Sequence, residues 1–336
     1  MLYFTMYICA QIFFGVRKGD AMVHWTGRQE RLQIPYLQRF WGFIYPWLIY
    51  EGISMLVTYV FAFYMVMTDP DFNPTVGSVL ESTLRLSDQV YAYYLELSLV
   101  ICLLTIPLLI LFFSLDRKRE RRADFTVETW QHAAPWGFVL CLLCGISASI
   151  VLNHVLIYSG IYAMLESSYE SSAELLFKGN VPLELISVGL LTPVTEELIF
   201  RGLIYRRIRW ISNALPAVLF SAVIFAVFHG NLLQGIYSFV MGMLLAFVYE
   251  RTHSLLAPIL VHVGANLVSV LLTESEGLQS VYLEGNESLF LLVTGGMMLL
   301  FVIVFYLFYA RIRPARIEEK GPAVTLDHER EEQYGT

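Results

Sequence analysis

The chain has 336 residues, of which 57% are apolar and only 15% are charged, and its formal net charge is -7. Soluble globular domains carry about a quarter charged residues, so this composition excludes a soluble globular protein. Nucleic acid is not an expected partner, because the positive residues gather in short segments between apolar runs and form no basic face. All four cysteines, including the pair Cys141 and Cys144, lie inside apolar stretches, and we interpret them as small packing residues. We therefore expect an integral membrane protein whose solvent is the lipid bilayer.

Runs of about 20 apolar residues mark candidate transmembrane helices, because that length crosses the hydrocarbon core of a bilayer. The predicted runs are 2–16, 41–67, 91–114, 135–158, 183–204, 214–229, 232–249, 254–273 and 289–310. Two of them, 2–16 and 214–229, are short, and we interpret the first as a retained helix because it lacks a basic start and a cleavage site. The sequence thus predicts an all-α polytopic membrane protein, a bundle of eight to nine transmembrane helices.

The Lys and Arg residues between these runs predict the orientation of the chain. They are abundant in segments 17–40, 115–134 and 205–213, and sparse in segments 68–90, 159–182 and 274–288. Basic loops stay in the cytoplasm, so the N-terminus is predicted outside and the C-terminus cytoplasmic. We divide the chain into residues 1–134, an N-terminal set of transmembrane helices with basic cytoplasmic loops, residues 135–310, a transmembrane helical core, and residues 311–336, a charged cytoplasmic tail.

Ionisable side chains inside a membrane span are costly unless they are paired or hydrated, so each one is a functional candidate. Glu51 is close enough to a helix end to reach interfacial water, and His154 is expected to be a neutral packing residue. In the stretch TPVTEELIFRG, by contrast, Glu196 and Glu197 are adjacent and deep in the span. Glu197 and Arg201 are four residues apart in the favourable order, so they can neutralise each other and leave Glu196 as the free carboxylate.

Two later spans carry further polar pairs at helical spacing. Phe225 and His229 share one helix face in FAVFHGN, and His262 and Asn266 share another in APILVHVGANLVS. At 1.5 Å of rise per residue, these polar groups and Glu196 lie roughly 12 to 22 Å from the cytoplasmic ends of their helices, near the bilayer midplane. A Glu and a His can deprotonate a water, while a second His and an amide stabilise an oxyanion. This set of groups is suited to the hydrolysis of an amide bond.

The same three stretches resemble a known protein family. EELIFR matches the pattern EExxxR, FAVFH matches FxxxH, and HVGAN matches HxxxN. Their order and approximate spacing are similar to those of the CAAX protease and bacteriocin-processing family, also called the Abi family, of intramembrane proteases. The resemblance covers about residues 181–275 within the helical core, whereas residues 1–134 resemble no family that we can name. It implies an intramembrane endopeptidase that cleaves peptides or membrane proteins, with prenylated CAAX proteins among the family's substrates.

The resemblance also implies a role for each matched residue. The expected catalytic residues are Glu196 and His229, which would activate water, and His262 and Asn266, which would stabilise the oxyanion; the expected supporting residues are Glu197, Arg201 and Phe225. We expect a glutamate-type protease that needs no cofactor, because a Glu paired with one His is sufficient to activate water. Zinc is the alternative, since Glu196, His229 and His262 could ligate it and leave one position open.

Other functions use the same residues in different ways. A membrane transporter could use them as a proton relay, a non-catalytic scaffold could retain them without turnover, and a buried polar network could hold the helices together. The intact motifs favour the protease. The expected partners are the lipid bilayer and a peptide or membrane-protein substrate, with prenylation of the substrate left open. We expect the bacterial plasma membrane, and the glycosylation sequon at residues 286–288 leaves a eukaryotic origin open.

Overall fold

The computed structural model describes residues 36–68, 79–122, 135–177, 180–275 and 287–311, and this part of the chain contains helices and no strand. The α-helices are α3 (Tyr36–Thr68), α4 (Val79–Ala92), α5 (Tyr94–Arg122), α6 (Pro135–Tyr158), α7 (Ile161–Leu176), α8 (Val181–Ile186), α9 (Thr192–Glu197), α10 (Arg206–Ile211), α11 (Ala214–Val227), α12 (Leu232–Thr252), α13 (Leu256–Glu274) and α15 (Glu287–Arg311), and two π-helical segments are η2 (Ser187–Leu191) and η3 (Leu198–Tyr205). The predicted all-α class is confirmed for the described residues. The predicted run 2–16 and the tail after residue 311 lie outside them.

Six described helices are long and apolar enough to cross a membrane. They are Phe40–Thr68, Tyr94–Arg122, Trp136–Tyr158, Leu232–Thr252, Leu256–Glu274 and Glu287–Ala310, and they coincide with six of the nine predicted runs. The predicted run 214–229 is helical as α11, but at Ala214–Val227 it is shorter than a full span. Many large apolar side chains on α3 and α15 are exposed, such as Phe63 and Leu292, as expected where lipid is the solvent. The total number of crossings and their orientation remain predictions.

Residues 181–211 form one uninterrupted helical rod in which α8, η2, α9, η3 and α10 follow one another without a turn. The sequence predicts a span at 183–204 followed by a basic loop at 205–213. The span is helical throughout and contains two π-helical segments, whereas the loop prediction is wrong because residues 206–211 continue the helix as α10. Short π-helical turns within α-helices are rare and occur frequently at functional sites.

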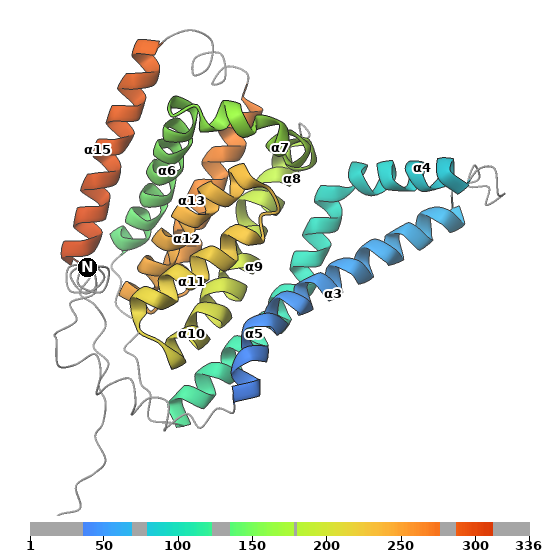
Figure 1. Cartoon of the computed structure of the whole chain (residues 1–336), viewed down its shortest axis with the longest axis horizontal. Coiled ribbons are helices and arrows are strands. Elements are labelled where there is room, and N and C mark those ends of the chain that lie inside the picture. Colours follow the sequence, from blue (N-terminus) through green and yellow to red (C-terminus); the bar gives the residue numbers. More distant parts are fainter. Residues whose placement is uncertain (1–35, 69–78, 123–134, 178–179, 276–286, 312–336) are drawn as a thin grey trace, which may run out of the picture.

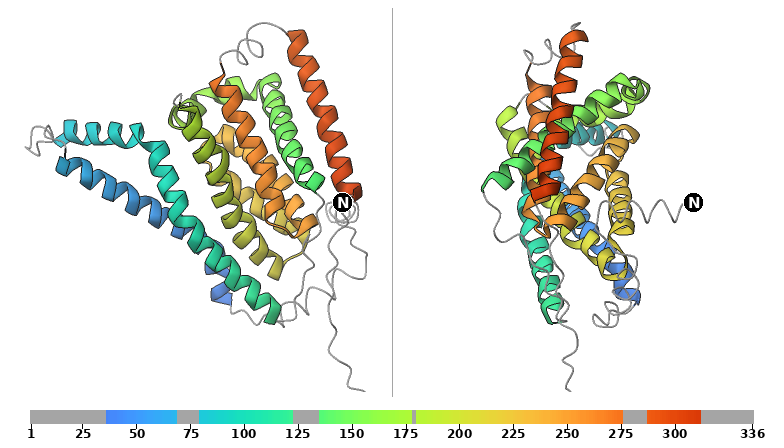
Figure 2. Two further views of the ribbon diagram at one scale, coloured as in Figure 1. Left: turned by 180° about the vertical axis from the view of Figure 1, so that it is seen from behind. Right: turned by 90° about the vertical axis from the view of Figure 1, so that its left-hand side faces the viewer.

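The helices form a body and an arm (Figure 1). The body contains the rod together with α6, α7, α11, α12, α13 and α15, and α15 packs against α6. We call α3, α4 and α5 the N-terminal arm. Helix α5 packs along the rod, and α3 packs against it at one end, whereas α4 and the neighbouring part of α3 extend away from the body (Figures 1 and 2).

Glycines allow α6 and α13 to pack with their backbones in close contact. A Cβ atom on Gly145 of α6 would lie 1.8 Å from the carbonyl oxygen of Val261, and a Cβ atom on Gly264 of α13 would lie 2.5 Å from the carbonyl oxygen of Leu142. Small residues at such an interface are typical of helix packing in membranes, where van der Waals contact and interhelical hydrogen bonds hold helices together. This contact fixes the position of α13 and therefore of His262.

Three arginines of α10 form buried or half-buried ion pairs with acidic residues of other helices. The pairs are Arg206 with Glu120 of α5, Arg207 with Asp116 of α5, and Arg209 with Glu250 of α12. We had interpreted these arginines as markers of a solvated cytoplasmic loop. The structure shows that they are paired and largely removed from water. Such pairs keep a fixed geometry, because an unpaired charge in the protein interior is strongly unfavourable. They fasten the rod to the N-terminal arm and to α12.

Candidate active site

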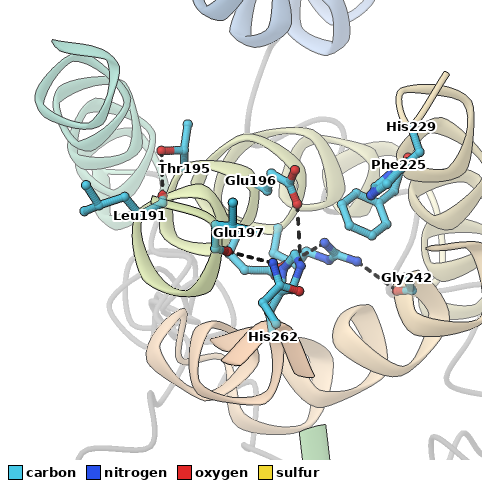
Figure 3. A network of polar contacts seen from close by, with 11 residues as sticks. Leu191, Thr195, Glu196, Glu197, Phe225, His229, Gly242 and His262 are labelled. Carbon is cyan, nitrogen blue, oxygen red and sulfur yellow. Dashed lines mark hydrogen bonds and ion pairs between the residues drawn. The ribbon is translucent and has the colours of Figure 1, made fainter. Parts of the chain in front are cut away.

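A buried ion pair forms the centre of the polar network shown in Figure 3. The Nη1 group of Arg201 donates to Oε1 of Glu197 at 2.7 Å, and both side chains have no exposed surface. The Nη2 group of Arg201 donates to the carbonyl of Gly242 in α12 at 3.1 Å, and the guanidinium lies 4.5 Å from the centre of the Phe225 ring. The predicted pairing of Glu197 with Arg201 is confirmed. Mutual neutralisation lets two charges remain in the interior of the bundle.

His262 lies between the two adjacent carboxylates of the rod. Its Nδ1 atom is 2.9 Å from Oε1 of Glu197, and its Nε2 atom is 3.5 Å from Oε2 of Glu196. Because the ionised Glu197 carboxylate can only accept a hydrogen bond, we assign a proton to Nδ1. Glu197 thus orients the imidazole, and the ring presents Nε2 to Glu196.

Glu196 is the accessible member of the acidic pair. Its side chain is 26% exposed, whereas that of Glu197 is fully buried. Its contact is with His262 of the third motif, whereas the motifs predict that it acts with His229 of the second. Within the described residues no direct contact joins Glu196 to His229, so their joint action on a water remains a prediction.

His229 is half-buried at the end of α11, where Phe225 holds it in place. Its Nδ1 atom lies 2.8 Å from the carbonyl oxygen of Phe225, so Nδ1 carries the proton and Nε2 carries the lone pair. The Phe225 ring meets the His229 ring edge to face at a centroid distance of 4.7 Å, and the His262 ring at 5.8 Å. Phe225 is thereby in contact with both imidazoles and with Arg201, which joins the second motif to the first and third.

Asn266 donates a hydrogen bond to the backbone carbonyl of Val188, which has no hydrogen-bond donor within the rod. In η2 the N–H of Thr192 donates to the carbonyl of Ser187, five residues earlier. The next carbonyl in this ladder is that of Val188, and its partner would be the nitrogen of Pro193, which has no hydrogen. The Nδ2 group of Asn266 donates to the Val188 carbonyl at 2.9 Å instead. One of its two N–H bonds is therefore engaged, and the other is free to act elsewhere.

A metal site of the predicted composition is not formed by the described residues. Among them, no three His, Cys, Asp or Glu side chains are arranged so that they could hold a metal ion. Because Glu196, His229 and His262 do not form such a cluster in the described structure, we derive no step through a metal.

Helices α3 and α5 of the N-terminal arm also lie near the site, although neither contains any of the three motifs. The Glu196 carboxylate interacts electrostatically with the phenols of Tyr50 in α3 and Tyr94 in α5, and with the thiol of Cys102 in α5. Cys102 lies within hydrogen-bonding reach of Thr195 in α9, next to Glu196 in sequence. We missed these residues because aromatic and thiol side chains in apolar runs are usually packing residues.

Comparison with known proteins agrees with the motifs. Residues 178–268 match the family model described as Type II CAAX prenyl endopeptidase Rce1-like. The chain is 27% identical over 203 residues, 60% of its length, to a protein of Bacillus subtilis (strain 168) named as a membrane peptidase, YdiL, of which 80% is covered. It is 25% identical over 183 residues, 52% of its length, to the membrane-embedded CAAX protease MroQ of Staphylococcus aureus (strain USA300), of which 70% is covered. No solved structure matches the chain. The resemblance inferred from the three motifs is confirmed by these matches, and the apolar helices of spanning length support an integral membrane protein.

Proposed function

We propose that this protein is an intramembrane endopeptidase that hydrolyses peptide bonds with a water activated by Glu196. One observation carries the proposal: of two adjacent carboxylates in the matched segment, one is neutralised and buried while the other is accessible beside His262. A general base needs an accessible carboxylate, and the buried pair supplies the rigid support that keeps the base in position. Glu197 and Arg201 therefore act as positioning residues.

The proposed reaction proceeds through a tetrahedral intermediate. Glu196, assisted by Nε2 of His229, takes a proton from the water, and the resulting hydroxide attacks the carbonyl carbon of the substrate. The carbonyl oxygen gains the negative charge and accepts hydrogen bonds from a protonated Nε2 of His262 and from the second N–H of Asn266. The C–N bond then breaks, and the proton held by Glu196 passes to the leaving amine. Every group in this sequence belongs to the chain or to water, and no metal ion takes part.

The proposed substrate is a peptide or membrane protein that enters from the bilayer. MroQ is named as a CAAX protease and the matched family model as a CAAX prenyl endopeptidase, so a prenylated cysteine peptide is one candidate within this class. Both relatives are bacterial, which supports our placing of the protein in a bacterial plasma membrane.

Comparison of membrane peptides in cells that carry wild type or Glu196→Gln tests the proposal. We expect uncleaved peptides to accumulate only with Glu196→Gln, since loss of a general base lowers turnover about 10²- to 10⁴-fold. Glu96→Gln is the matched control, because Glu96 is an exposed carboxylate on α5. Equal peptide profiles in wild type and Glu196→Gln cells with equal protein levels would overturn the proposal. A purified enzyme that loses cleavage with a zinc chelator and regains it with zinc would overturn the metal-free step.

A further inference from the structure

The hydroxyl groups of Tyr50 and Tyr94 have no assigned role, although both lie within electrostatic range of the accessible carboxylate. Tyr50 is partly buried and packs against the main hydrophobic core, and Tyr94 is half-buried at the start of α5. Each phenol interacts electrostatically with Glu196, and the two phenols interact with each other. Neither residue falls within residues 178–268, the segment that matches the family model.

The packing of the arm keeps these tyrosines in register with the rod. In α5, Tyr94 and Cys102 are eight residues apart and so share one helix face. Cys102 is 1% exposed and lies within hydrogen-bonding reach of both Thr192 and Thr195, so this face is turned to α9. Figure 3 shows α3 and α5 on the side of α9 opposite to α13. Glu196 is thus flanked by His262 on one side and by the arm on the other.

The hydrogen-bonding state of the two phenols sets them apart from a tyrosine that serves packing. The hydroxyl of Tyr237 in α12 donates to Oγ of Ser149 at 2.9 Å, which satisfies it inside the bundle. Tyr50 and Tyr94 make no hydrogen bond to any other described residue. A phenol that is half-buried and has a free O–H can donate to a ligand without first breaking a bond in the protein.

The other donors near Glu196 are already partly engaged. Nδ1 of His262 is bonded to Glu197, and one N–H of Asn266 is bonded to Val188. A substrate chain that presents its scissile carbonyl to Glu196 also brings neighbouring backbone carbonyls next to the arm. Those carbonyls lose their hydrogen bonds to water when the substrate enters the site, and they need hydrogen-bond donors from the protein in place of that water.

We propose that Tyr50 and Tyr94 are substrate-contacting residues of the active site, which donate hydrogen bonds from their hydroxyls to backbone carbonyls of the peptide beside Glu196. The inference rests on the proposed peptidase function and adds the N-terminal arm to the site. It explains why two helices outside the matched segment pack along the rod next to its catalytic carboxylate. The substrate is recognised there through its main chain, so these contacts do not depend on its side chains.

Removal of each hydroxyl in the full-length, membrane-embedded enzyme tests the inference. The substrate is a synthetic peptide with the sequence of one that accumulates in Glu196→Gln cells. Tyr50→Phe and Tyr94→Phe keep the ring and its packing, and we expect kcat/KM to fall about tenfold or more for each, as for loss of one hydrogen bond to the substrate. The controls are Tyr59→Phe on α3 and Tyr93→Phe in the turn between α4 and α5, two residues that are 71% and 44% exposed. We expect both controls to stay within about twofold of wild type in kcat/KM.

A purely structural role for these hydroxyls predicts a different result. In that case thermal stability would fall, and activity would fall only with it. The inference is overturned if both variants keep wild-type kcat/KM, or if their lost activity follows a lowered unfolding temperature. Loss of activity in Glu196→Gln together with full activity in both phenylalanine variants would leave the peptidase function standing without the arm. Equal activity of wild type and Glu196→Gln would remove the peptidase function and this inference with it.

Discussion

Substitution of Gly145 by alanine tests whether the close contact of α6 and α13 positions the catalytic centre. The new Cβ atom would lie 1.8 Å from the carbonyl oxygen of Val261, a backbone atom that cannot rotate away. Protein Cβ atoms essentially never approach another heavy atom closer than 3.0 Å, so α6 and α13 must separate by at least about 1.2 Å at this point. Val261 is followed directly by His262, whose bond to Glu197 is 2.9 Å long.

The magnitude of the effect follows from this displacement. A shift of about 1.2 Å at Val261 would displace His262 from the hydrogen-bonding geometry that it has with Glu197. Misplacement of a catalytic group by about 1 Å can lower the rate about a hundredfold, and overpacking of a well-packed interior costs about 1 to 3 kcal/mol. We therefore expect Gly145→Ala to lose about two orders of magnitude in kcat/KM and to unfold at a lower temperature.

The assay measures cleavage of the peptide that accumulates in Glu196→Gln cells. It also measures thermal unfolding of the purified protein, which is monitored by tryptophan fluorescence. Gly296→Ala on α15 is the matched control, because a Cβ atom there has no neighbour within 4 Å. That variant should match wild type in both measurements. Wild-type kcat/KM in Gly145→Ala would refute the argument that the backbone contact between α6 and α13 positions His262.

Two further predictions concern the supports of the site. Arg201→Ala leaves the buried Glu197 carboxylate without its counter-ion and should lower the free energy of unfolding by about 3 to 5 kcal/mol, and the double variant with Glu197→Gln should recover part of this loss. A double variant that is no more stable than Arg201→Ala would contradict the argument that the unpaired Glu197 charge causes the loss of stability. Asn266→Ala leaves the Val188 carbonyl without a donor and should cost about 1 to 3 kcal/mol in denaturant unfolding. Adding Pro193→Ala supplies a backbone N–H five residues after Val188 and should offset that loss, whereas an unchanged or greater loss would show that the π-helical ladder does not explain the contact.

Much of the membrane architecture could be predicted because hydropathy directly measures compatibility with lipid. Six predicted runs coincide with helices of spanning length. The π-helical segments of the rod at 181–211 could not be predicted, because hydropathy does not distinguish α-helical from π-helical turns. Its last helix, α10, was missed because three arginines within four residues are typical of a basic loop. Their partners, Glu120 and Asp116 on α5 and Glu250 on α12, are distant in sequence, so only the fold reveals the pairs.

The polar centre could be predicted in composition but not in its pairings. The spacing of Glu197 and Arg201 defined a local pair, which the structure confirms. The position of His262 depends on how α13 packs against the rod and α6, which no local spacing encodes. It therefore contacts both Glu196 and Glu197, a pairing that depth along a helix axis could not reveal. The tyrosines of the arm were missed for the same reason.

The first and third motifs also satisfy polar groups of each other and of the rod, which gives a structural reason for them to occur together. Pro193, three residues before Glu196, has no N–H to donate to the carbonyl of Val188. Asn266 of the third motif supplies the donor instead. The carboxylate of Glu197 accepts from Arg201 of its own motif and from His262 of the third. Loss of His262 or of Asn266 would therefore take a hydrogen-bond partner from the buried Glu197 carboxylate or from the Val188 carbonyl of the rod. The same contacts leave Glu196 as the accessible carboxylate of the pair, next to a Glu197 side chain that Arg201 and His262 hold in place.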